Sequence, residues 1–183
     1  MNFLLTGGAG YIGSHAALSL LDAGHNVHII DDLSTGNESL IPKNAFFTNC
    51  NINDEKVISE LIKSNSFDLL MHFAGFIQVE ESVKYPQKYF DNNTENATKL
   101  FETCKNNGLN KIVFSSTAAA YGSVSENKLI DENTNLNPQN PYAESKIKTE
   151  NFLFENKDDY KFIILRYFNV AGADKKLRSG QIS

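Results

Sequence analysis

A glycine-rich segment at residues 6–13, Thr-Gly-Gly-Ala-Gly-Tyr-Ile-Gly, constrains the fold of this chain more than any other stretch. It follows an apolar run at residues 3–5 and precedes an amphipathic pattern at residues 14–23, so the order is strand, turn, helix. Its spaced glycines are Gly7, Gly10 and Gly13. The first permits a turn with positive φ, the second lets backbone approach a bound group, and the third allows close helix–strand packing. The new helix N-terminus would favour an anion such as a pyrophosphate.

A second apolar run, at residues 27–30, ends in two acids, Asp31 and Asp32. An acid at this point can accept hydrogen bonds from both hydroxyls of an adenine ribose, and it would repel a 2′-phosphate. Asp31 therefore favours NAD over NADP. Taken alone, the glycines would also fit an ordinary strand-to-helix turn. Asp31 taken alone would also fit a solvated acid in a loop. Their common register in one strand–turn–helix–strand unit favours the dinucleotide interpretation.

Apolar runs typical of strands alternate with stretches typical of helices along the rest of the chain. Further strands are predicted at residues 45–48, 69–73, 111–116 and 162–165. Helices are predicted at residues 54–64 and 86–107, and from residue 141 onward. The alternation predicts βαβ units, and with the glycine turn it predicts an α/β, doubly wound parallel sheet (Rossmann fold) of order 3-2-1-4-5-6. A ligand crevice is expected at the carboxyl ends of strands one and four.

Length and composition bound the remaining possibilities. The 183 residues suffice for one well-filled domain, predicted at residues 1–174, and residues 175–183 read as the cut-short start of a further region. A formal charge of −5 offers no basic surface for nucleic acid, and no apolar run approaches membrane-spanning length. Without a signal-peptide pattern, the expected location is cytoplasmic. No His/Cys cluster has metal-ligand spacing, so no metal is expected.

Tyr142 and Lys146 are the strongest catalytic candidates. Pro141 suits the first position of a helix and Asn140 can cap it, which places Tyr142 and Lys146 four residues apart on one helix face. A tyrosine holds its proton to about pH 10, and a nearby ammonium lowers the pKa of the phenol, so that it can act as a base near neutral pH. Many helices carry this spacing by chance. The long loop at residues 118–140 and the dinucleotide fold give it weight.

Hydroxyls and small residues follow the predicted fourth and fifth strands. Residues 73–75, Phe-Ala-Gly, would let the chain pass close to a flat ligand, or simply form a tight turn. Residues 115–117, Ser-Ser-Thr, fit local turn caps and catalytic hydroxyls equally well.

Taken together, the motifs at residues 6–15, 31–36, 72–75, 115–117, 142–146 and 165–169 resemble those of the extended short-chain dehydrogenases/reductases. Within that group, the chain is similar to the NAD-dependent epimerase/dehydratase family and, more narrowly, to its UDP-hexose 4-epimerases. The resemblance runs from residue 1 to about residue 174.

The resemblance implies a role for each motif residue. Tyr142 would be the base, Lys146 would bind the nicotinamide ribose and tune Tyr142, and Thr117 would hydrogen-bond the reacting hydroxyl. The substrate would meet Thr117, Tyr142 and Asn169. The other implied NAD contacts are Gly7, Gly10, Tyr11, Ile12, Gly13, Asp31, Asp32, Leu33, Ser34, Thr35, Gly36, Asn51, Ile52, Phe73, Ala74, Gly75, Phe76, Ile77, Asn92 and Phe168.

The implied reaction is oxidation of sugar C4 by hydride transfer to NAD, rotation of the 4-keto sugar, and return of the hydride to its other face. The substrate would be a UDP-hexose such as UDP-glucose or UDP-galactose. Relatives also suggest a possible homodimer through helices around residues 89–107 and 143–154.

The chain departs from the family pattern at three places. Asn51 replaces a frequent aspartate near the adenine, Ile77 and Gln78 occupy a segment where some members carry a lysine, and the second domain that holds the nucleotide sugar is missing.

Four alternative functions compete with the epimerase interpretation. A 4,6-dehydratase needs an Asp-Glu pair where this chain has Ala118 and Ala119, and Asp31 disfavours an NADPH reductase. A fragment that binds NAD without turnover, and a purely structural domain, are the remaining alternatives.

Overall fold

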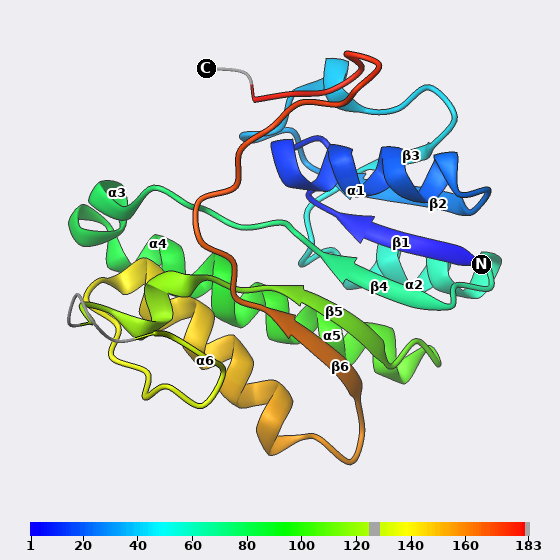
Figure 1. Ribbon diagram of the computed structural model, residues 1–183. Coiled ribbons are helices and arrows are strands. Elements are labelled where there is room, and N and C mark those ends of the chain that lie inside the picture. The colour runs from blue at the N-terminus through cyan, green and yellow to red at the C-terminus, as the bar shows by residue number, and fades with distance from the viewer. Residues whose placement is uncertain (125–128, 182–183) are drawn as a thin grey trace.

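The computed structural model describes residues 1–124 and 129–181. Within them, six parallel strands form one sheet of order β3-β2-β1-β4-β5-β6, which confirms the predicted Rossmann topology. The strands are β1 (Asn2–Thr6), β2 (Asn26–Asp31), β3 (Phe46–Asn49), β4 (Leu69–His72), β5 (Lys111–Ser115) and β6 (Lys161–Leu165). Their carboxyl ends point toward the left of Figure 1. Parts of the predicted loop and of the predicted C-terminal region, residues 125–128 and 182–183, lie outside the described residues.

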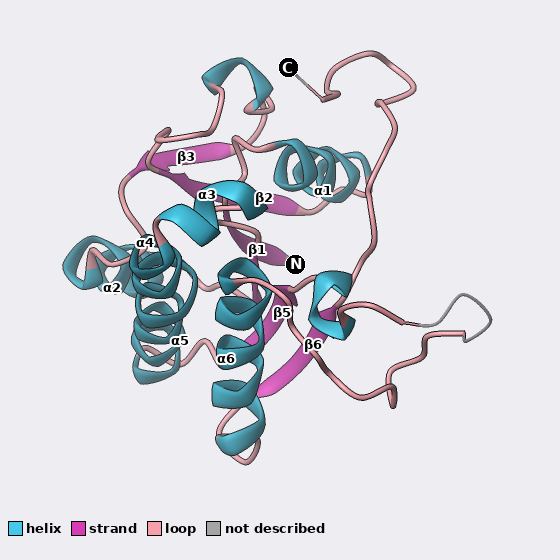
Figure 2. Cartoon of the chain, turned by 90° about the vertical axis from the view of Figure 1, so that its left-hand side faces the viewer, coloured by secondary structure: helices cyan, strands magenta, loops and turns pink. Residues whose placement is uncertain are grey.

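Helices cover both faces of the sheet. One face packs against α1 (Tyr11–Asp22), and the other carries a layer of α2 (Glu55–Ser64), α5 (Ala97–Asn106) and α6 (Pro141–Glu155), as Figure 2 shows. Two short helices, α3 (Val79–Lys84) and α4 (Pro86–Phe90), lie beyond the carboxyl end of β4.

The alternation of β1 side chains explains why its sequence is a continuous apolar run. Leu4 packs into the core beneath α2 and α5, whereas Phe3 and Leu5 pack into the second core beneath α1. Because both faces of a parallel sheet are covered, both sets of side chains are apolar. The carboxyl edge of the sheet is left as the place where polar side chains gather.

The predicted helix at residues 86–107 is one feature that the sequence pattern described too simply. The segment contains α4, a π-helical turn at Asp91–Asn96 and then α5, which ends before Gly108 at φ 88°. Widened turns of this kind often occur at functional sites. The preceding α3 was not predicted. Its two apolar residues, Val79 and Val83, are 42% and 64% exposed, and its buried residue is Ser82.

Residues 170–181 pack back against α1. The Tyr11 hydroxyl donates to the Gly172 carbonyl at 2.7 Å, and the Ser14 and Ser179 hydroxyls lie 2.7 Å apart. Arg178 donates to both carboxylate oxygens of Asp22 at 2.8 and 2.7 Å. The sequence showed no closing element here, yet this segment is anchored on the glycine-turn helix and reaches the carboxyl edge of the sheet.

Candidate active site

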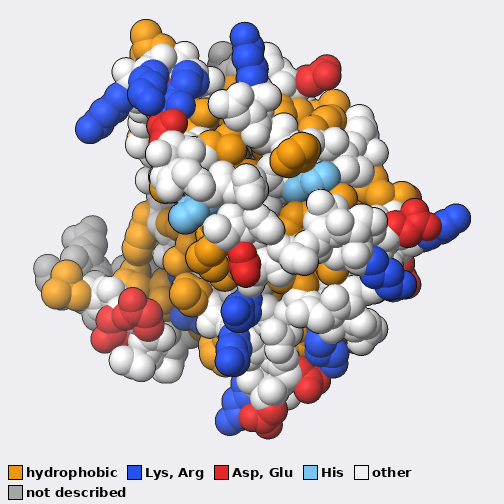
Figure 3. Space-filling view, turned by 90° about the vertical axis from the view of Figure 1, so that its right-hand side faces the viewer, with side chains coloured by type: hydrophobic (Ala, Val, Ile, Leu, Met, Phe, Trp, Pro, Cys, Tyr) orange, Lys and Arg blue, Asp and Glu red, His pale blue; other side chains and the backbone are white. Residues whose placement is uncertain are grey.

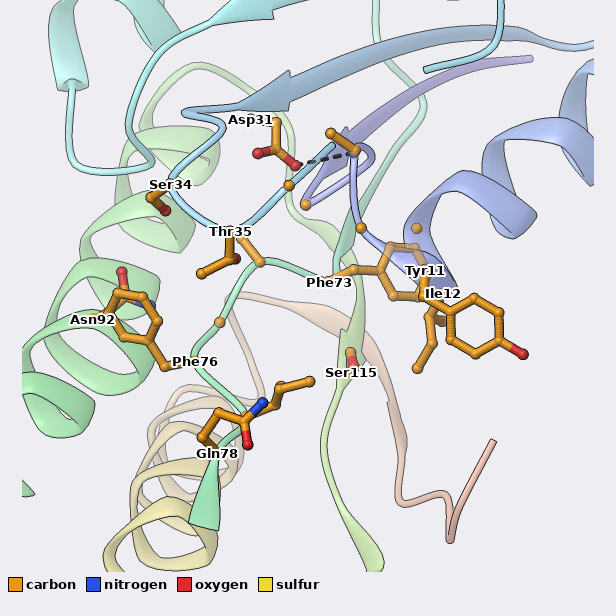
Figure 4. Close-up of a pocket in the computed structure, with 18 of the residues that line it drawn as sticks. Tyr11, Ile12, Asp31, Ser34, Thr35, Phe73, Phe76, Gln78, Asn92 and Ser115 are labelled. Atoms are coloured by element: carbon orange, nitrogen blue, oxygen red, sulfur yellow. Dashed lines mark hydrogen bonds between the residues drawn. The ribbon is translucent and has the colours of Figure 1, made fainter. Parts of the chain in front are cut away.

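A cavity of about 1470 Å³ opens beyond the carboxyl ends of β1, β2, β4 and β5. Every residue that the sequence and the resemblance nominated lines it. Tyr11 and Ile12 from the start of α1 lie on one side, and Asn92 from the π-helical turn lies with Phe76 on the other (Figure 4). The structure therefore brings the nominated residues together around one space, and their individual roles stay predictions.

The glycine turn adopts the geometry that its spacing predicts. Gly7 has φ 71°, and a Cβ there would lie 2.5 Å from the Ala74 backbone nitrogen. At Gly13 a Cβ would lie 2.1 Å from the Gly7 carbonyl oxygen, so only glycine lets α1 pack this closely on β1.

Gly10 faces the cavity instead. Within 4 Å, a Cβ at Gly10 would meet one described heavy atom, the Gly7 carbonyl oxygen at 3.2 Å. Among the described residues no side chain caps the helix that Gly10 begins, whereas Asp54 caps α2 and Asn140 caps α6. The first-turn N–H groups of α1, at Tyr11 and Ile12, line the cavity beside it. Uncapped N–H groups on a helix dipole fit an anionic group such as a pyrophosphate.

Asp31 has a structural task as well as its place on the cavity wall. Its carboxylate accepts hydrogen bonds from the backbone N–H of Ala9 at 3.0 Å and of Leu33 at 2.9 Å. Burial raises the pKa of Asp31, and these two bonds oppose the rise. Neighbouring Asp32 accepts from the Asn51 side chain at 2.7 Å, which places the amide of Asn51 at the edge of the same wall.

The predicted catalytic residues come from two elements. Asn140 caps α6 by accepting from the Ala143 N–H at 2.9 Å, as predicted, and this fixes the helix start from which Tyr142 and Lys146 project into the cavity. Thr117, just after β5, accepts from the Ala119 N–H at 3.1 Å. The hydroxyl of Thr117 is therefore a turn cap whose own proton is left to donate into the cavity.

The electrostatics of this pair differ from the expectation based on spacing. Burial raises the pKa of Tyr142, and a hydrogen bond with Thr117 opposes the rise. Burial lowers the pKa of Lys146, which is 3% exposed, to about 8, and the Glu150 carboxylate opposes that shift. The physical reason is that desolvation disfavours the charged form of each group. Desolvation is thus the largest influence on both pKa values.

Several residues that hold the site were missed by sequence reasoning. Asn93 accepts from the Phe76 N–H and donates to the Phe76 carbonyl, both at 2.9 Å, and also donates to Ser145. Gly75, which was nominated, lies against the same group of residues, since a Cβ there would lie 3.0 Å from the Lys146 Nζ. A polar residue inside an otherwise amphipathic pattern was the one available signal for Asn93.

Other predicted residues lie at the rim. Phe168 and Ile77 line the cavity and are 66% and 65% exposed, and Asn169 is exposed beside them. Ser115 also lines the cavity, although the sequence did not distinguish it from the next two hydroxyls.

Comparison with known proteins shows the family. The model of the NAD dependent epimerase/dehydratase family matches residues 3–183, and the chain belongs to that family. It is 44% identical to a UDP-glucose 4-epimerase of Azospirillum brasilense over 97% of its own length and 51% of that protein. It is 38% identical to UDP-arabinose 4-epimerase 1 of Arabidopsis thaliana over 97% of its length and 45% of that protein. The chain thus spans about half the length of these curated relatives.

Solved structures of 4-epimerases share the fold of this chain. A crystal structure of a UDP-glucose 4-epimerase superposes with a TM-score of 0.95 at 38% identity, covering 100% of this chain and 56% of that one. The Bifidobacterium longum UDP-glucose 4-epimerase, solved with NAD+ and UDP, gives 0.92 at 32% identity over 99% of this chain and 57% of that one.

Three observations concern other kinds of site. No group of three or more His, Cys, Asp or Glu residues able to hold a metal occurs in the described part of the chain. None of the described helices combines the length and apolar character needed to span a bilayer. On the face drawn in Figure 3, acidic and basic side chains are interspersed among polar and hydrophobic ones.

Proposed function

We propose that this chain carries the NAD site and the proton-transfer groups of a UDP-hexose 4-epimerase. The observation that supports this most directly is the convergence of Tyr142, Lys146 and Thr117 on the cavity that the glycine turn also lines. The family and the 4-epimerase relatives point to the same chemistry. The alternatives gain no comparable support, since Ala118 and Ala119 carry no group that could serve a dehydratase in proton transfer.

The residues present fit NAD. Bare backbone at Gly10 and the uncapped N–H groups of Tyr11 and Ile12 would hold the pyrophosphate. Asp31 to Gly36, with Asn51 and Ile52, would hold the adenosine. The loop from Phe73 to Ile77, with Asn92 and Phe168, would flank the nicotinamide end.

Each catalytic residue has a defined task in the proposed reaction, and Lys146 has two. Tyr142 removes the proton of the C4 hydroxyl, Thr117 donates a hydrogen bond to the same oxygen, and Lys146 donates to the cofactor ribose and favours the phenolate. When bound, NAD supplies the hydride acceptor and a positive ring that favours the phenolate. Asn169 contacts the sugar. Residues 1–174 act as the NAD-binding domain, and a homodimer through α5 and α6 is part of the proposal.

Replacing Tyr142 tests the proposal. Tyr142→Phe removes the proton acceptor and keeps the ring, so interconversion of UDP-glucose and UDP-galactose is expected to fall by about 10³-fold, a typical contribution of acid–base catalysis. The Kd for NAD, measured by isothermal titration calorimetry, is expected to stay near the wild-type value. Tyr160→Phe is the matched control, because Tyr160 is buried outside the cavity and its hydroxyl has no described hydrogen-bond partner.

The outcomes separate the candidates. A wild-type chain that binds NAD but does not interconvert the sugars indicates a binding module. Formation of a dehydrated 4-keto sugar indicates the dehydratase. A Tyr142→Phe protein with unchanged turnover contradicts the assignment of the base.

A further inference from the structure

A buried polar cluster lies directly behind the proposed catalytic residues. It consists of Ser116, Tyr121, Glu150 and Arg166, called here the Glu150 cluster. Glu150 is 1% exposed and accepts a hydrogen bond from the Ser116 hydroxyl. Arg166 donates to the same carboxylate from Nε at 3.0 and 3.1 Å and from Nη2 at 2.5 Å, and its Nη1 donates to the Tyr121 hydroxyl at 3.1 Å. Every member is thus bonded within the cluster.

The cluster ties together three segments that carry site residues. Ser116 immediately precedes Thr117, Glu150 stands one helical turn after Lys146 on α6, and Arg166 follows β6 two residues before Phe168. Glu150 and Arg166 are not among the residues that line the cavity. They can therefore affect a ligand there only through the groups that they hold.

Charge connects the cluster to Lys146 as well. The Glu150 carboxylate raises the pKa of the Lys146 ammonium, against the larger effect of burial. The other titratable groups on this side of the cavity are Tyr142 on the same helix and His72 at the end of β4, which Lys146 influences. Tyr89 of α4, with its ring edge-on to that of Tyr142 at 6.4 Å, and Tyr167 lie beside Tyr142. His72 and the tyrosines are neutral in their ordinary states, so among the described residues around Lys146 the negative charge is that of Glu150, partly offset by the Arg166 guanidinium that binds it.

We propose that Glu150 is a positioning residue for the proposed epimerase reaction. Its carboxylate fixes Ser116, just after β5, and the Arg166 segment against α6, and it stands one helical turn from the buried Lys146 side chain, whose ammonium it stabilises. The inference rests on the proposed function for its consequence, and on the contacts of the Glu150 cluster for its mechanism. The competing interpretation is an ion pair that serves stability alone.

The test replaces the charge but keeps the shape. In Glu150→Gln, the amide oxygen can still accept from Ser116, while the negative charge beside Lys146 is removed. The Lys146 side chain is titrated by NMR in the 183-residue chain labelled with [13Cε]lysine, with its signal assigned by Lys146→Arg, and the Kd for NAD is measured at pH 7.5. Glu144→Gln is the matched control, because Glu144 lies on the same helix and pairs at the surface with Lys148 at 3.3 Å.

The expected result is a Lys146 midpoint that shifts below its wild-type value near 8, and weaker NAD binding at pH 7.5, in Glu150→Gln but not in Glu144→Gln. A Glu150→Gln protein that loses stability while its Lys146 midpoint stays at the wild-type value overturns the proposal. If Glu150→Gln does not fold, the double variant Glu150→Gln/Arg166→Gln, which leaves no unpaired buried charge, is judged by the same midpoint.

The readouts also separate the two proposals. A wild-type chain that binds no NAD contradicts the proposed function. The Lys146 midpoint still decides the role of Glu150 in that case, because the titration needs no cofactor.

Discussion

The two walls of the cavity are built in different ways. The adenine-side wall, residues 7–52, combines local turns with hydrogen bonds inside one strand–turn–helix–strand unit, such as the Ala9–Asp31 and Asn51–Asp32 bonds across 22 and 19 residues. The carboxylates of Asp31 and Asp32 accept from backbone N–H groups two residues further on, and Asn51 binds the N–H of Asn53 in the same way. These are local side-chain–backbone turns. The turns of this wall are therefore specified locally, and its longer contacts stay within residues 7–52 or join Gly7 to Ala74.

The reaction-side wall, residues 73–78, 115–121, 142–150 and 165–169, depends on distant partners. Asn93 joins Phe76 across 17 residues and Ser145 across 52. Glu150 joins Ser116 across 34 residues. Such contacts exist only after α5 and α6 have packed on the sheet, so this wall forms with the tertiary structure.

The difference separates two kinds of substitution. On the adenine side, the main constraint is backbone meeting backbone, which no rearrangement of side chains can relieve. On the reaction side, polar side chains that take no direct part in the proposed reaction, such as Asn93 and Glu150, hold the residues that do. Substitutions on the two walls should therefore separate loss of fold from loss of ligand binding.

The largest effect is expected at Gly13. In Gly13→Ala the methyl group would lie 2.1 Å from the Gly7 carbonyl oxygen, and α1 would have to move off β1. A loss of about 3 kcal/mol in the free energy of unfolding is expected, the upper range for overpacking, measured by urea denaturation. A Gly13→Ala protein as stable as wild type would mean that the turn tolerates a wider helix–strand spacing.

Gly10→Ala is the matched comparison on the same turn. Its methyl group would meet only the Gly7 oxygen, at 3.2 Å, among the described atoms, and would project toward the cavity. Stability should change by well under half of the Gly13→Ala loss, while NAD affinity falls. Equal loss of stability in both variants would contradict the assignment of Gly10 to ligand approach.

A smaller effect is expected at Asn93. Asn93→Ala leaves the Phe76 N–H and carbonyl without their partner and disconnects Ser145, for a loss of about 2 kcal/mol. NAD affinity should fall as well, because the loop at residues 73–78 loses its anchor. Asn151→Ala on the exposed face of α6 is the control. Unchanged stability and affinity in Asn93→Ala would remove the contrast between the walls.

The same contrast explains how much could be predicted from sequence. The Gly7 turn and the Asn140 cap were predictable because each is set by residues within a few positions. The strand order was predictable because alternating strands and helices behind a glycine turn favour right-handed crossovers in a doubly wound sheet. All nominated residues line one cavity, because parallel strands bring their carboxyl ends to a common edge.

The missed features are those that arise from long-range packing. The π-helical turn at Asp91–Asn96 accompanies hydrogen bonds from Asn93 to two distant segments, which no local pattern encodes. The raised pKa of Tyr142 reflects burial by the folded chain, whereas the spacing of Tyr142 and Lys146 signals only their attraction. The place of Arg166 behind the site likewise depends on α6 meeting β6.

His72 lies where the two walls meet, and it gives the most specific prediction. Its Nδ1 lies 2.6 Å from the Thr6 hydroxyl at the end of β1, and its ring stacks on Phe114 of β5. Burial, with a smaller contribution from Lys146, lowers the pKa of His72 to about 3. The unfolded chain takes up a proton near pH 6.5, and the folded chain does so only near pH 3. Stability is therefore lost as pH falls through that window, by up to about 1.4 kcal/mol per pH unit.

His72→Asn keeps a partner for the Thr6 hydroxyl and removes the titrating ring. The variant should be less stable than wild type at pH 7.5, because ring packing is lost. Its free energy of unfolding should nevertheless fall less steeply between pH 6 and pH 4 than that of wild type. The two slopes should differ by up to about 1.4 kcal/mol per pH unit, which corresponds to the uptake of one proton. Urea denaturation at half-unit pH steps measures both slopes. Parallel slopes would show that His72 accepts a proton in the folded chain, and so that the junction between the walls admits water.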